Sequence, residues 1–159
     1  MFSDELVRTL AGFLSNIGIR AVAASSLEKT VFPGLDIQHG CVLIDESRLV
    51  YPGDILHEAG HLAVTTPGER QSARLNPGGG EELSALAWSY AAALHLGLDP
   101  ATVFYPASYQ GLGGELIRSF GEGKFIGVPL LQYFGMTVEP KKVRDAAMRP
   151  FPHMLRWLR

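Results

Sequence analysis

Residues 54–64 of the chain have the sequence DILHEAGHLAV, an apolar stretch that contains an HExxH motif at His57–His61. Its apolar side chains recur at the spacing of one helix face, and Pro-Gly pairs that favour turns stand on both sides of it. We therefore predict a helix over about Ile55–Val64, with the carboxylate of Asp54 as its N-terminal cap.

The motif places two imidazoles and a carboxylate where they can act on one metal ion. His57 and His61 are four residues apart, so both lie on the same helix face and can bind the same ion. Glu58 lies about 100° further around the helix, where it can reach a water on that ion more easily than the ion itself. Two histidine ligands with a glutamate base are the arrangement of zinc metalloproteases. The alternative is an ordinary helix with two partly buried histidines and a solvated glutamate.

A catalytic zinc ion usually has three protein ligands, so a third must come from elsewhere in the chain. Pro67 stands where metzincins have a third histidine, and Cys41 lies in an apolar, strand-like run that favours a structural role. The remaining candidates are Glu81 and Glu82, at the start of an alanine-rich helix that we predict over about Glu82–Leu96.

The two adjacent glutamates point about 100° apart, so only one of them can face the ion. Ala85 and Ser89 follow Glu82 on its own helix face, and such small side chains allow another helix to approach closely. Glu81 suits a different role, because a negative charge in the first turn stabilises a helix. The sequence favours Glu82 as the third ligand and leaves Glu81 as the alternative.

The remaining pattern predicts a single α+β domain over residues 1–159, with a core at about 19–98 and a helical, glycine-rich extension at about 99–159. The predicted elements are a helix over Leu6–Ile17 that ends at Gly18, strands at Ile19–Ala24, Leu35–Gln38 and Cys41–Ile44 with a turn at His39-Gly40, a loop over Thr66–Gly80, and short helices at Ala101–Phe104, Glu115–Phe120 and Val128–Phe134.

Composition narrows the classes of partner. The 14 Lys and Arg residues against 16 Asp and Glu give a net charge of -2, which argues against nucleic-acid binding. The single cysteine, Cys41, cannot form an internal disulfide, and the longest apolar stretch, Leu83–Leu98, is interrupted by polar residues. We therefore expect a cytoplasmic protein without a membrane span. The HExxH motif indicates that it acts on a peptide or protein, and its oligomeric state is left open.

The order of these features resembles one family. A strand at Cys41–Asp45, the HExxH motif and a helix that starts at Glu82 with the pattern E-x-x-A-x-x-aromatic-small are similar to ImmA/IrrE-type compact zincins, a gluzincin-like group of small metallopeptidases. The resemblance covers about residues 19–96. It implies a small mixed or antiparallel sheet packed by the HExxH helix and the Glu-bearing helix, with zinc in the cleft between them.

Carried over by position, the resemblance implies that His57, His61 and Glu82 bind Zn²⁺ and that Glu58 is the general base. The chain departs from the larger gluzincins at Leu86, four residues after Glu82, where those enzymes have an acidic residue that orients a ligand histidine.

The expected activity is hydrolysis of peptide bonds by a zinc-activated water, with Glu58 taking the proton. Tyr105, Tyr109 and His95 are candidate donors to the developing oxyanion. Two alternatives stay open: a zincin-fold binding or regulatory module without protease activity, and a non-heme iron site built from the same two histidines and one carboxylate.

Overall fold

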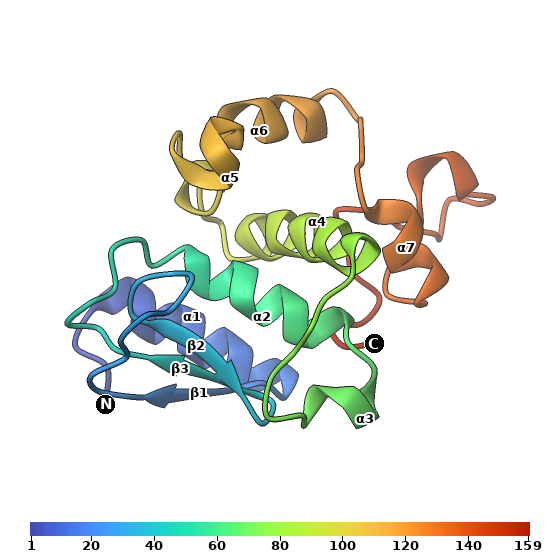
Figure 1. Cartoon of the computed structure of the whole chain (residues 1–159). Coiled ribbons are helices and arrows are strands. Elements are labelled where there is room, and N and C mark those ends of the chain that lie inside the picture. Colours follow the sequence, from blue (N-terminus) through green and yellow to red (C-terminus); the bar gives the residue numbers. More distant parts are fainter.

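The structure is a computed structural model that describes residues 1–159 (Figure 1). Its elements are α1 (Glu5–Ile17), β1 (Arg20–Ala23), β2 (Leu35–Gln38), β3 (Cys41–Ile44), α2 (Asp54–Val64), α3 (Pro67–Arg70), α4 (Gly79–His95), η1 (Pro100–Thr102), α5 (Ser108–Gly111), α6 (Gly113–Gly121), α7 (Val128–Tyr133) and η2 (Pro140–Lys142). A three-stranded sheet together with these helices agrees with the predicted α+β class.

The first helix begins and ends as its sequence predicts. The Asp4 side chain accepts a hydrogen bond of 2.9 Å from the backbone amide of Val7 and so caps α1. Gly18 ends the helix in the left-handed conformation, at a φ of 93°, which glycine adopts without strain. The apolar face of α1 is buried in the core.

The sheet is small and mixed. The strand order is β1-β3-β2, with β1 parallel and β2 antiparallel to β3, so β2 is an edge strand. The predicted hairpin is confirmed: His39 and Gly40 both have positive φ, at 49° and 73°, as a two-residue turn of this kind requires. Alternate residues of β2 and β3 are buried against the helices.

Helix α2 lies in the middle of the molecule, between the sheet with α1 on one side and α4 on the other (Figure 1). Every residue of α2 except Glu58 is buried. This burial explains why its sequence is apolar almost all around, and it includes the two histidines, which are 3% and 7% exposed.

Helices α2 and α4 approach closely at Gly60. A Cβ atom at this position would lie 3.0 Å from the carbonyl oxygen of Ala85 and 3.2 Å from the Ser89 hydroxyl oxygen. Ser89 Oγ also donates to the carbonyl oxygens of Ala85, at 2.7 Å, and Leu56, at 3.2 Å. The small-residue face predicted for the Glu82 helix is therefore confirmed as the contact with α2.

The C-terminal residues cover α4 and belong to the same core. Phe104, Phe120 and Phe151 are buried in the apolar cluster that also contains α1, α2 and α4 residues. The indole nitrogen of Trp88 donates to the carbonyl oxygen of Trp157 at 2.9 Å. Helices are present close to the positions predicted for this part of the chain. No helix of the structure combines the length and the apolar character needed to cross a membrane.

Two local predictions were wrong. Asp54 does not cap α2, because the N-cap position is Gly53 and no side chain bonds there; the Asp54 carboxylate instead accepts a hydrogen bond of 3.1 Å from the Tyr105 hydroxyl. The predicted loop over Thr66–Gly80 contains the short helix α3 and the start of α4. Helix α4 begins early because the Glu81 side chain accepts a bond from the Gly78 amide at 2.8 Å.

Candidate metal centre

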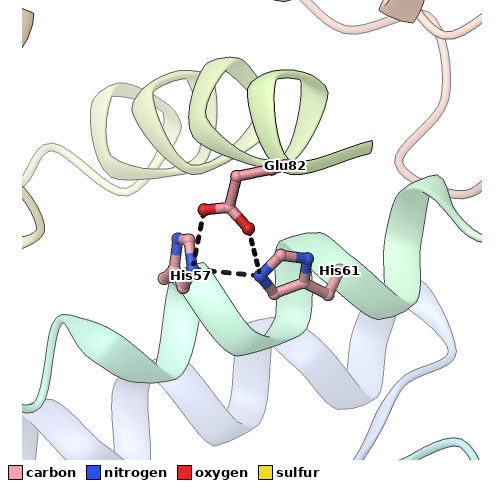
Figure 2. Close-up of side chains that lie close together, drawn as sticks. All are labelled: His57, His61 and Glu82. Carbon is pink, nitrogen blue, oxygen red and sulfur yellow. Dashed lines mark hydrogen bonds and ion pairs between the residues drawn. The ribbon is translucent and has the colours of Figure 1, made fainter. Parts of the chain in front are cut away.

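Two helices bring three potential metal ligands together. His57 and His61 project from α2 toward Glu82, which projects from the first turn of α4 (Figure 2). The two Nε2 atoms of the histidines are 3.0 Å apart. Glu82 Oε1 lies 3.5 Å from His57 Nε2, and Glu82 Oε2 lies 3.3 Å from His61 Nε2. Of the two candidate glutamates, the structure thus brings Glu82 to the histidines and places Glu81 at the helix cap.

These distances fit a shared metal ion. Zinc binds nitrogen and carboxylate oxygen at about 2.0–2.2 Å, which puts neighbouring ligand atoms of a tetrahedral site roughly 3.3–3.5 Å apart. Each carboxylate oxygen of Glu82 lies at such a distance from one imidazole, Oε1 from His57 and Oε2 from His61, and the imidazole–imidazole distance needs to widen by only a few tenths of an ångström. The cluster His57–His61–Glu82 could therefore hold a metal ion.

Both histidines are in the protonation state that a metal ligand needs. Burial and, to a lesser extent, the neighbouring His61 together lower the pKa of His57 to about 3. Burial also lowers the pKa of His61, in spite of the negative charges of Glu82 and Glu81. Each imidazole is thus neutral near pH 7 and keeps a lone pair for a cation.

Glu58 faces the same cavity as the three ligand candidates but is not one of them. The cavity has a volume of about 430 Å³ and is lined by His57, Glu58, His61 and Glu82. Burial raises the pKa of the Glu58 carboxyl to about 7, and the charges of Asp36, Asp54 and Glu82 contribute. A carboxyl group with this pKa can both accept and return a proton at neutral pH.

Tyr109 is hydrogen-bonded to His57, one of the candidate ligands. Its hydroxyl lies 2.9 Å from His57 Nδ1, the ring nitrogen that does not face Glu82. When His57 Nε2 binds a cation, Nδ1 carries the proton and donates to the tyrosine oxygen, which fixes the ring. Burial raises the pKa of Tyr109, so its hydroxyl stays protonated. The equivalent nitrogen of His61, Nδ1, is buried without a hydrogen-bond partner.

The backbone around Tyr109 is unusual. Tyr109 and Gln110 have positive φ values of 52° and 58°, a region that costs non-glycine residues on the order of 1 kcal/mol each. The surrounding structure holds this turn, with the tyrosine ring packed against Phe104 and His57. None of the three predicted oxyanion donors lines the cavity: Tyr109 bonds to His57 Nδ1, Tyr105 bonds to Asp54, and His95 packs against Phe13 and Trp157.

We expect Tyr109→Phe to lower zinc affinity about tenfold to a hundredfold, because removal of a partner that orients a ligand histidine typically has this effect. The measurement is competition with a chromophoric chelator. Tyr105→Phe is the matched control, since it removes a half-buried tyrosine hydroxyl that bonds to Asp54 and to no ligand. Equal affinity for all three proteins would show that the His57–Tyr109 bond does not support metal binding.

Sequence reasoning missed most of the cavity wall. The wall residues that it did not single out are Val31, Phe32, Leu35, Asp36, Ile37, Arg74, Leu75 and Pro77. They come from the edge strand β2, the segment before it and the segment between α3 and α4, none of which carries a motif. Cys41 is half-buried on β3 and is not part of the donor cluster.

Comparison of the chain with protein-family models, with curated proteins and with solved structures finds no match.

Proposed function

We propose that the protein is a zinc-dependent metallopeptidase of the compact zincin type. The observation that carries the proposal is the meeting of two neutral imidazoles and the Glu82 carboxylate at 3.0–3.5 Å, beside a second carboxylate, Glu58, in one cavity. The order of the HExxH helix and the Glu-bearing helix, similar to that of ImmA/IrrE-type zincins, supports the same assignment.

The donor set favours zinc and hydrolysis. Two histidines and one glutamate are a known ligand set of catalytic zinc, whereas a non-heme iron site uses the same residue types without needing a neighbouring base. Glu58 favours the hydrolytic reading, because its carboxyl borders the donors and has a pKa near 7. Zinc, when bound, supplies the positive charge that polarises a scissile carbonyl and makes a water molecule more acidic.

Residues of the chain would carry the remaining roles in catalysis and substrate binding. Glu58 would take the proton of the attacking water and give it to the leaving amine. Tyr109 would hold His57 in the orientation that ligation requires. The apolar wall, which includes Phe32, Leu35 and Leu75, would exclude bulk water and contact the side chains of the peptide.

The test measures metal content and peptide cleavage on the same samples. We expect one zinc ion per chain after loading, cleavage of a mixed peptide library, loss of cleavage with a chelator and recovery with zinc. His57→Ala should lose the zinc, while the control His153→Ala, a histidine outside the site, should keep it. Zinc bound equally well by His57→Ala would refute the assignment, and stoichiometric zinc without cleavage would favour the binding module.

A further inference from the structure

The cavity beside the metal centre contains a single Lys or Arg side chain, Arg74. Arg74 is exposed at the cavity wall and forms no ion pair with any carboxylate of the chain. Its guanidinium group therefore has its full set of donors free to bind an anion that enters the cavity.

The carboxylates that share the cavity already have partners or roles. Asp36 accepts from its neighbours on β2, namely the Ile37 amide at 2.9 Å and the Gln38 side-chain amide at 2.7 Å. Under the proposed function, Glu82 faces the metal ion and Glu58 faces the water. Arg74 is thus the one charged side chain of the cavity wall that has neither a hydrogen-bond partner nor an assigned role.

The segment that carries Arg74 is fixed at both ends. It joins α3 to α4 and passes over α2 in Figure 1. At one end the Ser72 carbonyl oxygen accepts from the His39 amide, in the β2–β3 turn, at 3.0 Å. At the other end the Gly78 amide donates to Glu81. Leu75, the next residue, is half-buried against the core, so the backbone at Arg74 is held at the cavity wall.

We propose that Arg74 binds a carboxylate of the peptide substrate within one or two residues of the scissile bond. This inference rests on the proposed function, because it requires a peptide in the cavity next to the metal centre. The small cavity, about 430 Å³, sets the short separation between that bond and the carboxylate. A guanidinium group pairs with a carboxylate through two parallel hydrogen bonds, which gives directional recognition. The carboxylate is either the C-terminus of the peptide or an Asp or Glu side chain.

The experiment measures binding separately from cleavage. Zinc-loaded Glu58→Gln protein is incubated with N-acetylated mixed-sequence tripeptides in four pools: free acids and C-terminal amides, each with and without Asp and Glu. Mass spectrometry then quantifies the retained peptides. The same measurement is made with Arg74→Gln and with the control Arg118→Gln, which makes the same change of charge at an exposed position of α6, in the Glu58→Gln background.

We expect peptides with a carboxylate to be enriched about tenfold over those without one, and Arg74→Gln, but not Arg118→Gln, to abolish the enrichment. Enrichment of all free acids identifies the C-terminus as the group bound, whereas enrichment of amides that contain Asp or Glu identifies the side chain. Equal retention of the four pools, retention of none, or enrichment that survives Arg74→Gln overturns the proposal. Zinc content measured on the same samples separates the two hypotheses: full zinc without a carboxylate preference refutes only the role of Arg74.

Discussion

Glu58→Gln protein is expected to cleave peptides about a hundredfold to ten-thousandfold more slowly than the unsubstituted chain while binding zinc equally well. The amide cannot accept a proton, so the water loses its base. The substitution preserves the size of the side chain, and Glu58 is not one of the three donors, so the metal centre should stay intact. The measurements are kcat on a peptide found by the library screen and zinc content by elemental analysis.

Glu115→Gln serves as the control, because it makes the same chemical change on the first turn of α6, outside the cavity. Its rate and its zinc content should match those of the unsubstituted chain. An undiminished rate in Glu58→Gln would show that Glu58 takes no part in the reaction. Loss of zinc in this variant would show instead that Glu58 contributes to metal binding.

The second large effect concerns two neighbouring glutamates. Glu82→Ala should weaken zinc binding by roughly a hundredfold or more, since it removes one of three ligands. Glu81→Ala should change zinc affinity much less, because the Glu81 carboxylate bonds to the Gly78 amide at the start of α4 and acts on His61 only through its charge. Loss of that cap should lower the free energy of unfolding of the metal-free protein by about 1 kcal/mol.

The two variants are therefore expected to give opposite results: Glu82→Ala mainly lowers the zinc affinity, and Glu81→Ala mainly lowers the stability of the metal-free protein. Chelator competition gives the zinc affinity, and denaturant unfolding of the metal-free proteins gives the stability. A Glu81→Ala protein that loses zinc while Glu82→Ala keeps it would reverse the assignment of the third ligand. This outcome would also show that α4 is rotated about its own axis in the metal-bound protein, so that Glu81 and not Glu82 faces the two histidines.

The parts of the site that could be predicted from sequence depend on short-range geometry. The helical spacing of His57 and His61 puts them on one face whatever the tertiary structure. Ala85 and Ser89 share the face of Glu82 for the same reason, and small residues there predict a close helix contact, which the structure contains. The choice of Glu82 over Glu81 followed from this face.

What sequence reasoning missed depends on contacts between distant segments. Tyr109 was predicted as an oxyanion donor, but its hydroxyl bonds to His57 where the chain turns sharply at two residues with positive φ, neither of which is a glycine. Arg74 borders the cavity because the His39 amide holds Ser72 across a long separation in sequence. Asp54 was wrongly assigned as a cap because its partner, Tyr105, is 51 residues away.

The glycine at position 60 links the stability of the protein to its chemistry. The close contact of α2 with α4 at Gly60 falls one residue before His61, so it helps to set how far the Glu82 helix stands from the two imidazoles. A larger side chain at position 60 would push α2 and α4 apart, and this would alter the metal affinity without contact with a ligand. A substitution at Gly60 is therefore expected to affect both the packing of the two helices and the coordination of the metal.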